Sequence, residues 1–306
     1  MSASAPAAAT APALRLTPVP RIGARGLLRT LRRNPSFILG LMMITALIGF
    51  CLIGRLFTTY NDAFPLSAPP SMPPGADWIF GTDADGRNLF AVIVYGSLLT
   101  LKIGVIAGCL GLGIGTTLAF FSAYRGGWFD VVLRVAVDVL ITIPTLLVLV
   151  VIASVLHRSM TTTLMGIIIA LLAWREPTRQ IRSQVLVMRE AQYVKLAVLN
   201  GASSARIIFL EMMPNLLPFL GANLVVAISQ AVLASIGLEA LGLGSPSEPT
   251  LGLTIYWMMN ESAFLLGMWW WIIEPIAVLI VLFVGLFLLT AGLDEIANPR
   301  LRRAEA

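Results

Sequence analysis

The sequence predicts an all-α integral membrane protein with six transmembrane helices. Of its 306 residues, 58% are hydrophobic and 12% are charged, whereas soluble domains carry about 25% charged residues. The mean hydropathy is +0.87, and several apolar runs approach the roughly 20 residues that a helix needs to cross a hydrocarbon core. We expect the six spans at 37–57, 98–121, 129–156, 163–174, 217–243 and 269–293.

The first span follows a basic flank. The chain starts with an Ala-, Pro- and Ser-rich stretch without charge, which buries too little surface to fold. The arginines between Arg15 and Arg33 then precede the apolar run 37–57. This run is too long for a signal peptide and lacks a small-residue cleavage site, so we expect an uncleaved anchor. Residues 1–36 are therefore assigned to a cytoplasmic tail with a disordered start.

An external segment, 58–97, separates the first span from a five-helix core at 98–293, and residues 294–306 form a second tail. Prolines punctuate the external segment and exclude a long helix there. Within the core, the span 163–174 has the shortest apolar run. The last span begins with Trp269, Trp270 and Trp271, which suit the membrane interface because an indole ring is apolar and its N–H is polar.

The basic residues predict the orientation. The formal net charge is +5, and in this topology most of the basic side chains lie in the tails and in the loops on the same side as the tails. The four exceptions are Arg55, Arg87, Lys102 and Arg158. An excess of Lys and Arg marks the cytoplasmic side, so both termini are expected in the cytoplasm. The basic excess therefore reflects topology, and no nucleic-acid partner is expected.

The longest cytoplasmic loop, at about 175–216, has the pattern helix, tight turn, helix. Its apolar residues recur at helical spacing, and the pair Asn200–Gly201 is suited to ending a helix in the left-handed conformation. One interpretation is a helix end that docks on a soluble partner. The other is an amphipathic connector lying at the lipid headgroups, held by Arg182, Arg189 and Arg206.

Three acidic residues stand out inside the predicted spans: Asp138, Glu239 and Glu274. An ionisable group at this depth usually faces a cavity or a partner. Asp138, Ser235 and Glu239 are candidates for lining a translocation path, and the alternative is pairing with a backbone group or another subunit. No metal or cofactor site is expected in this chain, because the only histidine, His157, has no second ligand nearby and both cysteines, Cys51 and Cys109, lie in apolar runs.

The cytoplasmic loop resembles the EAA loop of ABC importer permeases. Its spacing from Gly201 to Pro214 matches the two most constrained positions of that motif, while Lys195, Leu196 and Ala197 stand where the motif has Glu, Ala and Ala. The resemblance implies that the loop couples the membrane domain to an ATPase. The implied coupling residues are Glu190, Tyr193, Lys195, Leu196, Ala197, Leu199, Asn200, Gly201, Ala202, Ser203, Arg206 and Pro214.

The external segment carries a second resemblance, to the Leu-Gly-Thr-Asp-x-x-Gly-Arg-Asp motif of one permease type in oligopeptide, dipeptide and nickel importers. The residues that carry it are Gly81, Thr82, Asp83, Gly86 and Arg87, with Phe80 and Asn88 replacing the usual Leu and Asp. The glycines are compatible with a tight turn and Asp83 with a side-chain cap. A structural role and contact with a binding protein both remain open here.

The resemblance implies the architecture of a type I ABC importer permease in the bacterial inner membrane. This chain has no Gly-Lys pair, since its lysines, Lys102 and Lys195, follow Leu and Val, so it lacks a phosphate-binding loop. The implied partners are two ATPase subunits that bind ATP and Mg²⁺, a second homologous permease, an extracytoplasmic solute-binding protein and membrane lipid. The expected cargo is oligopeptide or dipeptide, and the alternatives are oligosaccharide import and an ion-coupled secondary transporter.

Overall fold

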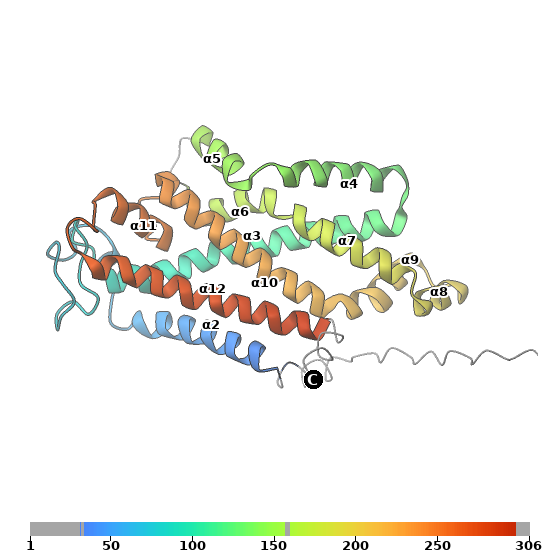
Figure 1. Cartoon of the computed structure of the whole chain (residues 1–306), viewed down its shortest axis with the longest axis horizontal. Helices are drawn as coiled ribbons and strands as arrows, with labels where there is room; N and C mark the ends of the chain where they lie inside the picture. The colour runs from blue at the N-terminus through green and yellow to red at the C-terminus, as the bar shows by residue number, and fades with distance from the viewer. Residues whose placement is uncertain (1–30, 32–33, 157–159, 298–306) are drawn as a thin grey trace, which may run out of the picture.

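The computed structural model describes residue 31 and residues 34–156 and 160–297, and these residues form a bundle of long helices (Figure 1). Most of the two predicted tails, 1–36 and 294–306, lies outside the described residues, as do His157 and Arg158. The described helices are α2 (Pro35–Gly54), α3 (Leu89–Arg125), α4 (Gly127–Thr142), α5 (Thr145–Leu156), α6 (Thr162–Ala173), α7 (Arg175–Arg189), α8 (Gln192–Leu199), α9 (Ser204–Arg206), α10 (Met213–Leu238), α11 (Leu251–Asn260) and α12 (Trp269–Ala297). Shorter elements are a 3₁₀ turn at Tyr60–Ala63 and π-helical segments at Ile207–Met212 and Glu239–Leu243.

The prediction of a helical protein with several membrane-spanning segments is confirmed. Four helical stretches among the described residues are long and apolar enough to cross a membrane, namely α2, α3, Ser204–Leu243 and α12. The predicted third span is not one straight helix, because α4 and α5 meet at an angle of 82°. The predicted fourth span, α6, has 12 residues and is about 18 Å long, which is shorter than a hydrocarbon core of about 30 Å.

Helix α3 begins at Leu89 rather than at the predicted Leu98. The Asn88 side chain accepts a hydrogen bond of 3.0 Å from the backbone N–H of Phe90, which caps the helix where the external segment ends. An N-terminal cap of this kind satisfies a backbone N–H that has no partner inside the helix. The first turns of α3 are apolar, from Leu89 to Val94, so the apolar run of this helix starts nine residues before the predicted boundary.

Helix α3 is the centre of the bundle and packs on α10, α6 and α7. Glycines on one side of it allow the backbones to approach closely. A Cβ at Gly108 would lie 2.9 Å from the backbone N of Ile228 in α10, and one at Gly111 would lie 3.0 Å from the carbonyl carbon of Ala173 in α6. Small residues commonly allow such packing between membrane helices.

The bundle has two distinct ends. The segment between α2 and α3 lies at one end of the long axis, and α8 and α9 lie at the other (Figure 1). Helix α2 begins and α12 ends toward the α8–α9 end. We call residues 58–88 the external cap and residues 190–212 the coupling region.

Candidate functional site

The predicted tight turn in the coupling region is confirmed. Gly201 has a φ of 73°, and the chain reverses there through two hydrogen bonds of 3.0 Å, from the N–H of Ala202 to the carbonyl of Ala197 and from the N–H of Gly201 to the carbonyl of Val198. This pair of bonds is the Schellman motif, which needs a left-handed residue at the position of Gly201. Ser203 then caps α9 by accepting a 3.3 Å bond from the N–H of Arg206.

The predicted first helix of this loop is divided in two. Helix α7 ends at Arg189, and α8 begins at Gln192 after an extended Ala191. Across this break Lys195 and Glu190 form an ion pair of 2.9 Å, with side chains 58% and 69% exposed. The ion pair holds the pKa of the exposed Glu190 carboxyl below its usual range. Because both groups are in water, this contact is a weak surface interaction.

Helix α8 packs on the bundle with one side and exposes the other. Val194 is buried in a cluster with Ala119 and Phe120 of α3 and with Ile207 and Met212 of the next segment. The opposite side presents apolar side chains to the surroundings: Leu196 is 59% exposed, Val198 55% and Leu199 81%. Exposed apolar side chains beside charged ones are suited to a protein partner.

The structure brings the sequence-predicted coupling residues together around α8 and the turn. The exposed members are Glu190, Lys195, Leu196, Leu199, Asn200, Gly201, Ser203, Arg206 and Pro214, and the half-buried members are Tyr193, Ala197 and Ala202. Burial raises the pKa of the Tyr193 hydroxyl, which faces Glu211 of the segment Ile207–Met212 and Asn215 of α10. The coupling function of these residues stays a prediction.

Arginines spaced seven apart along α7 fasten it to α3 and α4. Arg182 binds Asp130 of α4 through two hydrogen bonds of 2.6 Å, and Arg189 donates a 3.1 Å bond to the carbonyl of Ala123 in α3. Seven residues are nearly two helical turns, so these side chains share one side of α7. The interpretation of Arg182 as a headgroup anchor is therefore wrong, because its guanidinium group binds Asp130. Arg189 and Arg206 are exposed, and for them the headgroup interpretation stays a prediction.

Arg175 lies on the same side of α7 as Arg182 and Arg189, and its side chain binds the bend between α4 and α5. Pro144 has no N–H, so the carbonyl of Leu140 loses the hydrogen bond that a continuous helix would give it. The buried Arg175 guanidinium donates to this carbonyl and, at 2.8 Å, to the hydroxyl of Thr145. In a membrane every backbone group must find a partner within the protein, and here an arginine from another helix supplies it.

A cavity of about 450 Å³ lies between α5, α6, α7 and α10. Its wall is apolar except for Thr145, Arg175, Glu176 and Gln230. The side chain of Gln230 donates a 2.9 Å hydrogen bond to Glu176, and both residues are exposed. The volume falls within the range of about 300–1,000 Å³ that is typical of small-molecule sites.

None of the predicted translocation-lining residues belongs to this wall. Ser235 is fully buried and donates to the carbonyl of Val232, and the buried Glu239 lies against Gly252 of α11. Asp138 is exposed on α4 and lines a small hollow with Thr178, Arg179 and Arg182 of α7. Their role in translocation stays a prediction.

Sequence reasoning missed Arg175 and Glu176 as intramembrane candidates because it ended the fourth span at Trp174. A signal was available, since the apolar run of α6 is too short to cross a bilayer unless the charged residues after it are included. The sequence also gave no sign of the contact with Leu140, which comes from a different helix. Only the packing of α7 against the bend shows it.

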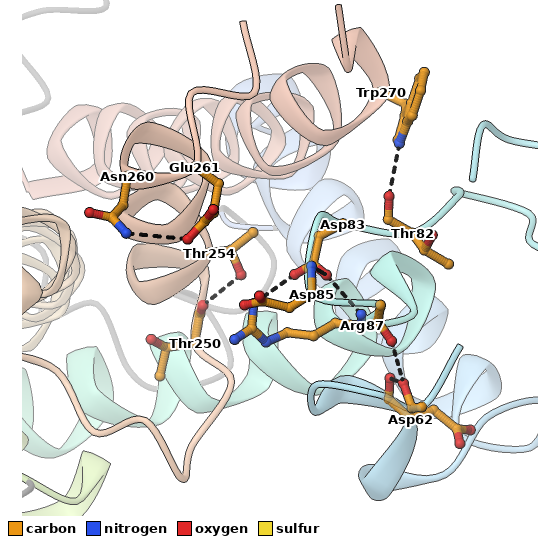
Figure 2. A network of polar contacts seen from close by, with 12 residues as sticks. Asp62, Thr82, Asp83, Asp85, Arg87, Thr250, Thr254, Asn260, Glu261 and Trp270 are labelled. Carbon is orange, nitrogen blue, oxygen red and sulfur yellow. Dashed lines mark hydrogen bonds and ion pairs between the residues drawn. The ribbon is translucent and has the colours of Figure 1, made fainter. Parts of the chain in front are cut away.

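The external cap is built around the buried carboxylate of Asp83. Arg87 lies between Asp83 and Asp85, with ion-pair distances of 2.7 and 2.9 Å (Figure 2). The Asp83 carboxylate also accepts backbone N–H bonds from Asp85 and Arg87 at 3.0 and 2.7 Å. Burial raises the pKa of Asp83, and its bonds with Arg87 oppose that effect. The guanidinium group of Arg87 lies 4.9 Å from the centre of the Trp257 ring.

The motif residues Gly81, Thr82 and Gly86 hold the cap together. Gly81 and Gly86 have φ values of 74° and 75°, and a Cβ at Gly86 would overlap the carbonyl oxygen of Ala68. Trp270 donates a 3.2 Å bond to the carbonyl of Thr82 (Figure 2). These contacts give the motif a structural role, although they do not test contact with a binding protein.

The tryptophan cluster differs from its prediction. Trp269 is 59% exposed, as a membrane-interface residue would be, but Trp270 and Trp271 are 9% and 0% exposed. Both pack with Leu89, Ala263 and Met268 beneath the cap. The placement at the membrane interface is therefore wrong for Trp270 and Trp271, because their rings fill the contact between the cap and α12.

The sequence of this chain is similar to those of known membrane transport proteins. Residues 111–303 match the model of the family described as binding-protein-dependent transport system inner membrane component. The chain is 29% identical to the dipeptide transport system permease protein DppC of Alkalihalophilus pseudofirmus, over 90% of this chain and 89% of that one. It is 30% identical to a putative peptide permease protein of Brucella abortus, over 88% of each chain. It is 27% identical to the oligopeptide transport system permease protein OppC of Bacillus subtilis, over 89% of this chain and 88% of that one.

The long apolar helices, the exposed helix–turn–helix unit and these similarities define a multi-pass permease of the inner membrane. The chain belongs to the family of binding-protein-dependent transport system inner membrane components. It is a transport protein and not an enzyme. This membership overturns the alternative of an ion-coupled secondary transporter.

Proposed function

We propose that this chain is a permease subunit of an ATP-driven importer that moves dipeptides and oligopeptides across the inner membrane. The observation that carries the importer role is the exposed unit of α8, the Gly201 turn and α9 at one end of the bundle. The cargo class is supported by relatives named as dipeptide, oligopeptide and peptide permeases, each matched over most of both chains.

The proposed assembly contains a second homologous permease, two ATPase subunits that carry ATP and Mg²⁺, and an extracytoplasmic binding protein, with lipid around the helices. The ATPases dock on the coupling region, where Leu196 and Leu199 supply apolar contacts. The binding protein docks at the end of the external cap. Six crossings follow from counting α4–α5 and α6–α7 as one span each, and both termini are then cytoplasmic.

The arginines of α7 suggest how movement at the coupling region reaches the membrane. When the ATPases close on ATP, α8 moves and displaces α7, which is fastened to α3 and α4 by Arg189 and Arg182. Arg175 transmits this displacement to the bend between α4 and α5, and α5 lines the cavity. Binding free energy in the ATPases thus biases a two-state membrane domain.

Substitution of Leu199 tests the proposal. We expect Leu199→Asp to abolish co-purification of the ATPase subunits, because a carboxylate would be buried without a partner in an apolar contact. The matched control is Leu66→Asp, which changes a leucine 92% exposed in the external cap and should leave ATPase association intact. If the unmodified chain, expressed with its genomic neighbours, retains no ATPase, the importer role is wrong.

A further inference from the structure

The cavity between α5, α6, α7 and α10 lies beside the middle of a predicted membrane span. Gln230 stands near the middle of α10 and of the predicted span 217–243, and the residues of α10 in the cavity wall run from Ala227 to Gly237. Glu176, the second residue of α7, faces Gln230 at 2.9 Å. An ionisable side chain at this depth normally faces a cavity or a pathway, and Glu176 does so.

The two charged side chains of the cavity wall, Arg175 and Glu176, differ in how accessible they are from the cavity. Arg175 is 6% exposed, and its guanidinium donates to Leu140, Thr145 and the carbonyl of Leu172. The Glu176 carboxylate is exposed, and the hydrogen bond that the structure gives it comes from the neutral amide of Gln230. A molecule inside the cavity therefore meets an accessible negative charge, an amide and apolar side chains, while the positive charge is directed at the bend.

We propose that this cavity is a peptide-binding subsite of the passage, in which Glu176, held by Gln230, binds an ammonium group of the cargo. The apolar side chains of the wall accept the uncharged part of the peptide. This inference rests on the proposed function, because it assumes that peptides cross through this subunit. A carboxylate is an acceptor of charge-assisted hydrogen bonds from an ammonium group, and that group is the peptide amino terminus or a lysine side chain.

Uptake of matched peptides by the whole transporter in proteoliposomes tests the proposal. The peptides are trialanine, its N-acetyl derivative and N-acetyl-Ala-Lys-Ala. We expect Glu176→Gln to slow trialanine uptake about tenfold, as for loss of one charge-assisted contact, and Glu176→Asp to restore most of it. Uptake of N-acetyl-trialanine by Glu176→Gln should equal that of the unmodified transporter. Slower uptake of N-acetyl-Ala-Lys-Ala would show that the side-chain ammonium is also bound.

Two uptake results for Glu176→Gln overturn the inference. One is trialanine uptake at the unmodified rate, and the other is an equal loss for trialanine and its N-acetyl derivative. If Glu176→Gln prevents co-purification of the sister permease while Glu176→Asp does not, the cavity is a subunit interface and the inference is wrong. If the unmodified transporter takes up no peptide, the proposed function fails instead, so the two failures are distinguishable.

Discussion

The external cap and the coupling region lie at opposite ends of the bundle and stabilise their turns differently. In the cap, Asp83 is 1% exposed, and its carboxylate binds the side chain and backbone of Arg87 and the backbone of Asp85. In the coupling region, the turn at Gly201 is formed by backbone hydrogen bonds alone, and no atom lies within 4 Å of a Cβ placed there. The turn around Asp83 is held by buried contacts with neighbouring residues, whereas the turn at Gly201 projects from the bundle.

This difference indicates how the two ends work. A segment with many buried contacts opens only with global unfolding, whereas an exposed segment with few contacts opens at low cost. The external cap therefore provides a fixed surface at the amino-terminal ends of α3 and α12. The coupling region leaves its apolar side chains available for a partner that completes its packing.

The largest expected effect on stability comes from Gly86→Ala. Its φ is 75°, and a Cβ would overlap the carbonyl oxygen of Ala68, so we expect a loss of about 3 kcal/mol from strain and clash. The measurement is the thermal unfolding midpoint of the purified protein in detergent. Gly75→Ala is the matched control, because a Cβ at Gly75 meets its nearest neighbour at 3.9 Å. Equal midpoints for the two variants would show that the cap tolerates change.

A smaller loss is expected for Asp83→Ala. Removing the carboxylate leaves Arg87, whose side chain is 11% exposed, with Asp85 as its remaining ion-pair partner. We expect a loss of about 2 kcal/mol, since a buried charge loses one of its two partners. Asp83→Asn should lose less than Asp83→Ala, because its side-chain oxygen still accepts the backbone N–H bonds. The opposite order of unfolding midpoints would contradict the importance of those bonds.

Substitution of Gly201 should affect coupling more than stability. Gly201→Val forces a β-branched residue to a φ of 73°, which costs about 1–2 kcal/mol at the turn. Because a Cβ at Gly201 meets no neighbour within 4 Å, we expect the unfolding midpoint to fall less than in Gly86→Ala and the uptake per ATP hydrolysed to fall several-fold. Gly201→Asn is the control, since asparagine tolerates this conformation. Normal uptake per ATP in Gly201→Val would argue against the turn as a coupling element.

The smallest effect is expected for the ion pair between Glu190 and Lys195. Both side chains are more than half exposed, so the double variant Glu190→Gln, Lys195→Gln should unfold at an unchanged temperature. If ATPase association weakens in this variant, the pair contacts the partner directly. A lowered unfolding midpoint would show that the coupling region is more tightly held than its exposure indicates.

Local signals in the sequence predicted both turns. Asn200–Gly201 indicated the end of a helix, and the glycines and Asp83 of the 81–87 segment indicated a side-chain-capped turn. Both rest on conformations that a few neighbouring residues determine. The general membrane class followed from composition for the same reason, because burial in lipid requires apolar side chains whatever their tertiary contacts.

Contacts between distant segments could not be predicted. The bond from Trp270 to Thr82 and the bond from Arg175 to Leu140 each join residues from different helices or loops. Periodicity and hydropathy contain no information on which helices become neighbours. The cavity wall escaped prediction for the same reason, since α5, α6, α7 and α10 contribute to it from separate parts of the chain.

The bend at Pro144 has a consequence for the biogenesis of the protein. Ribosomes synthesise a chain from its amino terminus, so Leu140 and Pro144 are made before Arg175. Until α7 has been made, the carbonyl of Leu140 lacks the guanidinium that it binds in the folded chain. A carbonyl without a hydrogen-bond partner is costly in lipid. We therefore expect the nascent α4–α5 segment to remain at a hydrated site of the insertion machinery until Arg175 has been synthesised.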